Sequence, residues 1–186
     1  LAAGRLEDWH SKGFDLLIKA WGMLDPEVRK KWTLKIAGKE APKSLAYLKN
    51  LCKQYGVENS VKFLGFREDI DKLMQQASIF VLSSRYEGFG LVLIEAMSQG
   101  CACIAADYKG RQKEIFGSID NGIAIETESS TSMTDQLQLL INDEGERLRL
   151  QKNAVQQSSF FSLDNISRKW NSLLSSLVNS NTTASQ

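Results

Sequence analysis

The chain has 186 residues, of which 42% are hydrophobic and 24% charged, and this composition suits one globular domain with its own core. Its formal net charge of +1 predicts no broad basic face, which argues against binding of nucleic acid through phosphate neutralisation. No apolar run approaches the roughly 20 residues that a membrane-spanning helix needs.

Short apolar segments alternate with longer amphipathic ones as far as about residue 145. Most of the apolar segments lack polar alternation, which is typical of strands that are covered on both faces. The predicted strands are Leu1–Leu6, Thr33–Gly38, Ser60–Leu64, Ser78–Ser83, Cys101–Ala106 and Gly122–Glu126.

The segments between these strands carry helix signals. Asp25-Pro26-Glu27 has the pattern of a capping residue, a first-turn proline and a first-turn acid. Pro42 likewise opens a helix, which Gly56 ends. The longer predicted helices are Phe14–Leu24, Pro42–Tyr55, Ile70–Ala77, Leu91–Gln99, Lys113–Phe116 and Ser132–Asn142.

This alternation predicts an α/β fold, a three-layer Rossmann-like doubly wound parallel sheet of about six strands with right-handed crossovers. Two closing helices are expected at Glu146–Gln157 and Leu163–Val178. Residues 1–178 are therefore interpreted as a single domain, with 146–178 as its closing helices and 179–186 as a flexible tail. In such sheets ligands bind at the carboxyl ends of the strands, so the loops there are the places to search.

The three cysteines are Cys52, Cys101 and Cys103, an odd number without a framework spacing, which argues against a disulfide scaffold. Cys101 and Cys103 alternate along an apolar run, where we expect them to be small buried side chains. A C-x-C pair with a single histidine in the chain makes a poor zinc site. We therefore expect no metal site and a reducing, cytoplasmic compartment.

Two cations follow the first predicted strand. Arg5 stands where that strand ends, and Lys12 precedes the first helix. Arginine offers a planar fork to phosphate oxygens and lysine offers a mobile point charge, so together they could bind an anion above the sheet. The alternative is that both are solvated loop residues.

A second constellation follows the strand that ends near Leu82. Gly88 and Gly90 flank Phe89 at the start of a predicted helix, whose free N–H groups form an anion site. Glu87 precedes this turn, and Glu95 lies about one turn inside the helix within an apolar run. A buried carboxylate there needs donors, which sugar or ribose hydroxyls would supply. The alternatives are a structural salt bridge or cap for Glu95 and a turn carboxylate for Glu87.

The segment Glu87–Glu95 resembles the E-x7-E signature of the large family-four group of retaining GT-B glycosyltransferases. Other parts of the chain agree in order and spacing, and the resemblance covers roughly residues 1–126. These parts are Ala3–Leu6 with Lys12–Phe14, Val61–Phe66, Glu95–Gly100 followed by Cys101–Ala106, and Asn121-Gly122.

The resemblance implies that the chain is the donor-binding C-terminal half of a glycosyltransferase of the hexosyltransferase type. Arg5 and Lys12 would bind the diphosphate of a nucleoside-diphosphate sugar, Glu87 would accept hydrogen bonds from the transferred sugar, and these three would be the catalytic groups. Glu95 would hold the ribose. The backbone of Gly88, Phe89, Gly90 and Leu91 would line the sugar and the phosphates, and the Leu91 side chain would pack against the nucleoside. The backbone near Arg67, after Gly65-Phe66, would contact the base. Lys72 is another candidate for contact with the base.

The resemblance also implies metal-independent transfer and no cofactor, because cations and helix amides replace the metal. Asp69-Ile70-Asp71 has the spacing of a metal motif but stands at a helix start, where acids favour the dipole. A glycan or lipid-linked acceptor, as in polysaccharide biosynthesis, and any peripheral membrane contact would depend on an N-terminal domain outside this sequence. We expect this fragment to bind nucleotide without transferring sugar.

Two departures from the family pattern concern the loops near the donor. Ser83-Ser84 stands where a proline is usual, and Lys109–Glu114 replaces a double-glycine turn. Other functions also stay open at this point. One is another GT-B enzyme, such as a nucleotide-sugar epimerase or a sugar phosphorylase. The other is a non-catalytic doubly wound binding module, although Gly4-Arg5 occupies the place where a receiver-type domain needs acids.

Overall fold

The computed structural model describes the backbone of residues 1–183 and the side chains of residues 1–177. Its strands are β1 (Ala2–Ala3), β2 (Leu34–Ala37), β3 (Val61–Phe63), β4 (Ile79–Leu82), β5 (Ala102–Ala106) and β6 (Ile123–Ile125). Its α-helices are α1 (Phe14–Met23), α2 (Pro26–Arg29), α3 (Pro42–Gln54), α4 (Ile70–Gln75), α5 (Leu91–Ser98), α6 (Arg111–Phe116), α7 (Ser130–Asn142), α8 (Glu144–Ser158) and α9 (Leu163–Thr183). Short 3-10 turns are η1 (Leu6–Asp8), η2 (Tyr108–Gly110) and η3 (Ser159–Phe161).

The strands form two three-stranded parallel ladders, β1-β2-β3 and β4-β5-β6. Leu1 joins them, because its nitrogen donates to the Ile79 carbonyl at 2.8 Å and its carbonyl accepts from the Val81 nitrogen at 2.9 Å. The resulting order β3-β2-β1-β4-β5-β6 is that of a doubly wound sheet, so the predicted α/β fold is confirmed.

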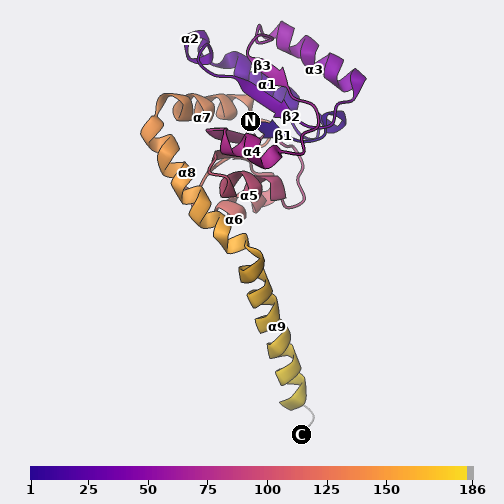
Figure 1. The fold of residues 1–186 in the computed structure, drawn as a ribbon, viewed down its shortest axis with the longest axis vertical. Coiled ribbons are helices and arrows are strands. Elements are labelled where there is room, and N and C mark those ends of the chain that lie inside the picture. Colours follow the sequence, from indigo (N-terminus) through magenta and orange to yellow (C-terminus); the bar gives the residue numbers. More distant parts are fainter. Residues whose placement is uncertain (184–186) are drawn as a thin grey trace.

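Alternate strand residues pack into two separate cores, which explains why β4 and β5 are apolar and buried at every position. Ile79 and Val81 of β4 point into the core that contains side chains of α1, α3 and α7. Phe80 and Leu82 point into the core that contains side chains of α4, α5 and α6. The sheet is thus the middle of three layers, as predicted, with α8 running along the body beside them (Figure 1).

The structure changes two predicted boundaries. The first strand is shorter than Leu1–Leu6, because it ends at Ala3 and the buried Leu6 enters the core from η1. At the other end, α9 continues to Thr183 and leads away from the body (Figure 1), so residues 179–183 have helical backbone, and the flexibility expected at 179–186 stays a prediction. Residues 184–186 of that expected tail lie outside the described residues.

The cysteines behave as predicted. Cys52, Cys101 and Cys103 are buried free thiols. Burial raises the pKa of Cys52 and of Cys101 to about 11, so both stay protonated at neutral pH. The Cys101 thiol donates to the Met74 carbonyl at 3.2 Å, as expected for a small core side chain with a weak donor.

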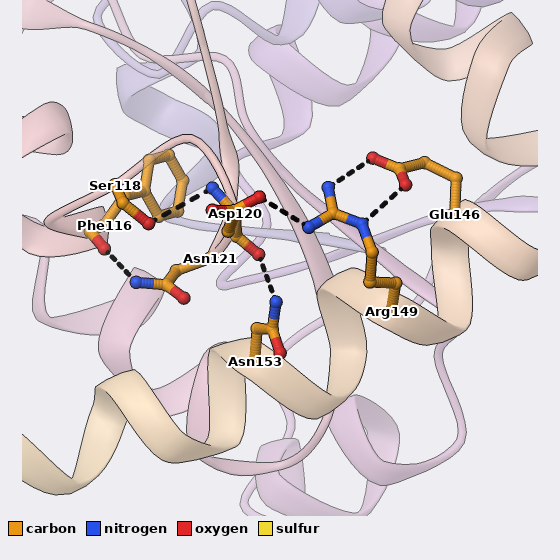
Figure 2. Close-up of polar contacts among 7 residues, drawn as sticks. All are labelled: Phe116, Ser118, Asp120, Asn121, Glu146, Arg149 and Asn153. Atoms are coloured by element: carbon orange, nitrogen blue, oxygen red, sulfur yellow. Dashed lines mark hydrogen bonds and ion pairs between the residues drawn. The ribbon is translucent and has the colours of Figure 1, made fainter.

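A polar network holds the turn before β6 against α8 (Figure 2). The Asn121 side-chain amide donates to the Phe116 carbonyl at 2.7 Å and to Gln157 Oε1 at 3.3 Å. Arg149 Nη1 lies 2.7 Å from Asp120 Oδ1, and the rest of the Arg149 fork binds Glu146. The Asn121-Gly122 turn predicted from the sequence is therefore fixed by the first closing helix.

Substitution Asn121→Ala is expected to lower the free energy of unfolding by about 1–2 kcal/mol, because two partly buried hydrogen bonds are lost. Urea denaturation would measure this. The matched variant is Arg149→Met, which removes exposed ion pairs with Asp120 and Glu146. These ion pairs should contribute less to the free energy of unfolding, and their contribution should decrease in high salt. An Asn121→Ala effect no larger than that of Arg149→Met would contradict the prediction.

Candidate functional site

Two of the predicted site residues meet at the carboxyl edge of the sheet. Lys12 Nζ lies 2.7 Å from Glu87 Oε1, although the two residues are 75 positions apart. Ser84 Oγ donates to the same oxygen at 2.7 Å. The side chains of Lys12 and Glu87 are 25% and 10% exposed, so the pair is half enclosed. Glu87 Oε2 receives no hydrogen bond from any side chain that the structure describes.

The backbone around Lys12 explains this placement. Its side chain crosses Gly4, where an added Cβ would lie 3.2 Å from Lys12 Cγ. Ser83 Oγ donates to the Lys12 carbonyl at 2.8 Å. Gly13 then begins α1 at a φ of +64°, in the left-handed region that glycine adopts without strain. The ends of β1 and β4 therefore bring lysine and glutamate together.

The helix tip predicted at Gly88-Phe89-Gly90 is also present. Gly90 has a φ of +89° and precedes α5, which has no side-chain cap. Gly88 and Phe89 are exposed, and the Leu91 side chain is 64% exposed. A helix start with no side-chain acceptor has backbone N–H groups that can bind an anion. This position lies next to the Lys12–Glu87 pair.

The expectation of a buried Glu95 is wrong. Glu95 lies on the exposed side of α5, while Leu93, Ala96 and Met97 point into the core. No salt bridge or cap to the Glu95 carboxylate occurs among the described residues, so neither structural alternative is realised there. The carboxylate is open to solvent and to a ligand.

Arg5 does not share the Lys12–Glu87 pair. Its guanidinium lies 2.6 Å from Asp8 and 3.6 Å from Glu7, and the side chain is 67% exposed. In this structure Arg5 is a solvated loop residue, which was the alternative considered for both cations, whereas Lys12 is not. Exposed ion pairs of this kind contribute little stability, so Arg5 can leave Asp8 for a stronger anion at small cost.

A pocket of about 350 Å³ opens at the ends of β1 and β2, beside α4. Phe66, one of its walls, is 70% exposed, and the Arg67 guanidinium binds Asp69 in a fork at 2.8 and 2.7 Å. Gly65 shapes the turn at a φ of +68° without lining the pocket, and Lys72 is exposed on α4 outside it. The lining residues are Ala3, Gly4, Arg5, Ala37, Gly38, Lys39, Phe66, Arg67 and Ile70.

Sequence reasoning missed several residues of this edge. Gly38 and Lys39 line the pocket, and the rule that loops after parallel strands hold the ligand could have found them. Arg111 donates to the carbonyls of Glu87, at 3.1 Å, and Gly88. Gln112 is fully buried, and its Nε2 has no partner among the described residues. Both stand in the loop that departs from the family pattern.

A doubly wound sheet with a cation–carboxylate pair and a glycine-led helix tip at its carboxyl edge belongs to the class of doubly wound α/β domains that bind ligands at this edge. Within that class the family is clear. Residues 1–157 match the family described as "Glycosyl transferases group 1", and the chain belongs to that family.

Curated relatives match most of this chain but only part of their own length. An uncharacterized glycosyltransferase of Haemophilus influenzae is 32% identical over 94% of this chain and 48% of its own length. An N-acetylgalactosaminyltransferase of Campylobacter jejuni, named for a diphospho-undecaprenol substrate, is 30% identical over 90% of this chain and 44% of its own. The chain thus spans about half the length of these relatives.

Solved structures agree with this placement. The Anabaena protein HepE in complex with UDP is 28% identical, with a TM-score of 0.82 over 94% of this chain and 48% of that one. The C-terminal domain of a group 1 glycosyl transferase from Francisella tularensis is 30% identical, with a TM-score of 0.71 over 86% of this chain and 82% of that one. These matches confirm the GT-B type of fold for this chain.

Proposed function

We propose that this chain is the donor-binding half of a retaining glycosyltransferase that moves a sugar from a nucleoside-diphosphate sugar to a glycan or lipid-linked acceptor. The observation that carries the proposal is the Lys12–Glu87 pair beside the uncapped start of α5. HepE was solved with UDP and with UDP-glucose, which supports a nucleotide-sugar donor for this chain.

In this proposal the diphosphate lies between Lys12 and the first N–H groups of α5. Lys12 uses one of its three ammonium donors on Glu87, so it can contact phosphate without breaking that bond. Arg5 turns from Asp8 to the phosphates when donor binds, because its present ion pairs are exposed. Glu87 offers its second oxygen to a hydroxyl of the sugar.

The nucleoside extends from α5 toward the pocket at the end of β1. Glu95 accepts hydrogen bonds from the ribose, and the exposed Leu91 side chain packs against the nucleoside. The base lies beside Phe66 and the backbone near Arg67, and Lys72, which does not line this pocket in the structure, stays a further candidate for the same region. The exposed apolar groups here gain from ligand burial, at roughly 25 cal/mol per Å².

For the reaction itself, we propose that the anomeric C–O bond breaks with oxocarbenium character and that the acceptor attacks on the same face. Lys12, Arg5 and helix amides stabilise the departing diphosphate in place of a metal ion. In this proposal Glu87 is not a covalent nucleophile: Oε1 accepts hydrogen bonds from Lys12 and Ser84, and Oε2 binds a hydroxyl of the sugar. Asp69, the first acid of the Asp-x-Asp spacing, is engaged by Arg67, whose hydrogen bonds lower the pKa of Asp69.

Acceptor binding is proposed for the part of the relatives' length that this chain does not cover. The name of the Campylobacter jejuni relative supports a lipid-linked acceptor. Within the described part of the chain, every helix is too short or too polar to span a membrane. Peripheral membrane contact and the reducing, cytoplasmic compartment stay predictions.

Calorimetric titration of the chain with UDP, GDP and ADP tests the proposal. We expect binding of at least one of the three, and UDP first, given the HepE complexes. Incubation of the full-length enzyme with UDP-glucose and no acceptor separates transfer from epimerisation, because an epimerase would alter the sugar. No heat with any of the three nucleotides would contradict donor binding.

Substitution Glu95→Ala is expected to raise the Kd for UDP about tenfold, the loss of one hydrogen bond to a charged group. Stability should stay within about 0.5 kcal/mol, because Glu95 is exposed and has no partner among the described side chains. Calorimetry and thermal unfolding measure the two effects. Asp135→Ala, which removes an exposed carboxylate on α7, is the control. An unchanged Kd in Glu95→Ala would contradict the ribose role.

A further inference from the structure

Arg85 is an enclosed cation between the two loops that carry the Lys12–Glu87 pair. We call residues 4–13 the β1–α1 loop and residues 83–90 the β4–α5 loop. Arg85 belongs to the second, and its side chain is only 9% exposed. A buried guanidinium needs partners for its donors, and these partners show what the residue connects.

The partners of Arg85 lie in the β1–α1 loop and at the start of α1. Its fork binds both oxygens of Asp15 at 2.8 Å, and Nη1 also donates to the His10 carbonyl at 2.6 Å. Its backbone nitrogen donates to the Ser11 carbonyl at 2.8 Å. Nε lies 3.6 Å from the exposed Glu128 carboxylate. Hydrogen bonding to Asp15 raises the pKa of Arg85, so this cation is permanent.

These contacts surround Lys12 in the sequence. His10 and Ser11 precede it and Asp15 follows it, while Glu87 is two residues beyond Arg85. A lysine side chain has many rotamers, and holding it against a carboxylate costs conformational entropy unless both backbones are fixed. The Arg85 contacts supply that fixation on each side of the pair.

We infer that Arg85 is a positioning residue, which sets the β1–α1 loop against the β4–α5 loop so that Lys12 meets Glu87. Its effect on nucleotide binding rests on the proposed function. Arginine suits the place because its planar fork binds Asp15 through two nitrogens and still reaches a backbone carbonyl. A lysine there could not make all of these contacts in the same geometry.

The test uses the 186-residue chain, UDP as the probe, and four variants: Arg85→Met, Lys12→Met, the double variant and Arg147→Met. Arg147 is the matched control, since it is 12% exposed, donates to the Leu140 carbonyl at 2.7 Å, and lies on α8 outside the site. Calorimetry gives the Kd and thermal unfolding gives the stability of each variant.

We expect Arg85→Met to raise the Kd about 5–30-fold and Lys12→Met about 10–100-fold. Because Arg85 acts through Lys12, the double variant should bind no more than about twofold more weakly than Lys12→Met alone. Arg147→Met should lower the unfolding temperature and leave the Kd within about twofold. A purely structural role would not produce this non-additivity.

Three results would overturn the inference: an unchanged Kd in folded Arg85→Met, losses that multiply in the double variant, or an equal loss in Arg147→Met. If Arg85→Met does not fold, Arg85→Lys replaces it with the same expectations. If the unsubstituted chain binds none of UDP, GDP and ADP, the proposed function fails. Amide hydrogen exchange of Arg85→Met then tests the positioning role of Arg85 without a ligand. Faster exchange at residues 10–13 and 84–88 than in Arg147→Met supports the positioning role, and unchanged exchange overturns it.

Discussion

Substitution Gly13→Ala is expected to lower the free energy of unfolding by at least about 3 kcal/mol, a large effect for a single methyl group. Two terms add. Gly13 has a φ of +64°, which strains any residue with a Cβ, and the new Cβ would lie 2.0 Å from the Ser83 carbonyl oxygen and 2.8 Å from its carbon. Backbone cannot rotate away as a side chain can, so one of the two loops must move.

Gly56 provides the control for this prediction, because its φ is +62° and an added Cβ would meet nothing within 4 Å. Gly56→Ala should therefore show the backbone strain alone, about 1–2 kcal/mol. Urea denaturation of both variants separates strain from collision. Equal losses in the two variants would mean that the β1–α1 loop relaxes freely, which would also weaken the case for a fixed Lys12.

Lys12→Met is expected to give the largest loss of function, a Kd for UDP that is about 10–100 times higher. The methionine keeps the apolar stem over Gly4 but removes the charge that faces Glu87 and the proposed diphosphate. Among the described side chains, Ser84 is then the remaining donor to the Glu87 carboxylate, whose charge repels phosphate across the vacated position.

The control for charge is Lys30→Met, which breaks an exposed Lys30–Glu27 ion pair outside the site and should leave the Kd unchanged. Titration with uridine adds a second comparison, because a role in phosphate binding predicts that Lys12→Met weakens UDP but spares uridine. If UDP and uridine lost affinity equally, Lys12 would be acting on the fold of the site rather than on phosphate.

The order of strands and helices followed from the sequence because most strands are apolar runs and several helices begin or end at a glycine or proline. Leu6 shows where this reasoning fails. It is buried like a strand residue, but its burial comes from η1, and hydrophobicity alone does not distinguish the two backbones.

Glu95 shows a failure that the sequence could have avoided. Leu91, Glu95 and Ser98 have helical spacing and form the exposed side of α5, whereas the prediction treated the apolar run as buried all round. The exposed Leu91 in that row indicates a face open to ligand, which the apolar pattern concealed.

Other features depend on contacts that no local pattern encodes. Arg85 meets Asp15 across 70 positions, and this requires the finished sheet to bring β1 and β4 together. The contact between Lys12 and Glu87 likewise depends on the finished sheet. The family resemblance placed the two residues in one site, but their spacing in the sequence alone could not predict the contact. The Arg5–Asp8 ion pair differs from these contacts, because the two residues are three positions apart and their contact can be predicted from local sequence spacing.

The junction at Leu1 places the proposed ligand site across the boundary between the two half-sheets. The strands β1, β2 and β3 lie on one side of Leu1 and β4, β5 and β6 on the other, so the backbones of the two half-sheets pair along one seam at Leu1. Lys12 follows β1 and Glu87 follows β4, on opposite sides of that seam. A nucleotide held by both therefore acts as a non-covalent crosslink between the halves, and its occupancy raises their resistance to separation with ligand concentration.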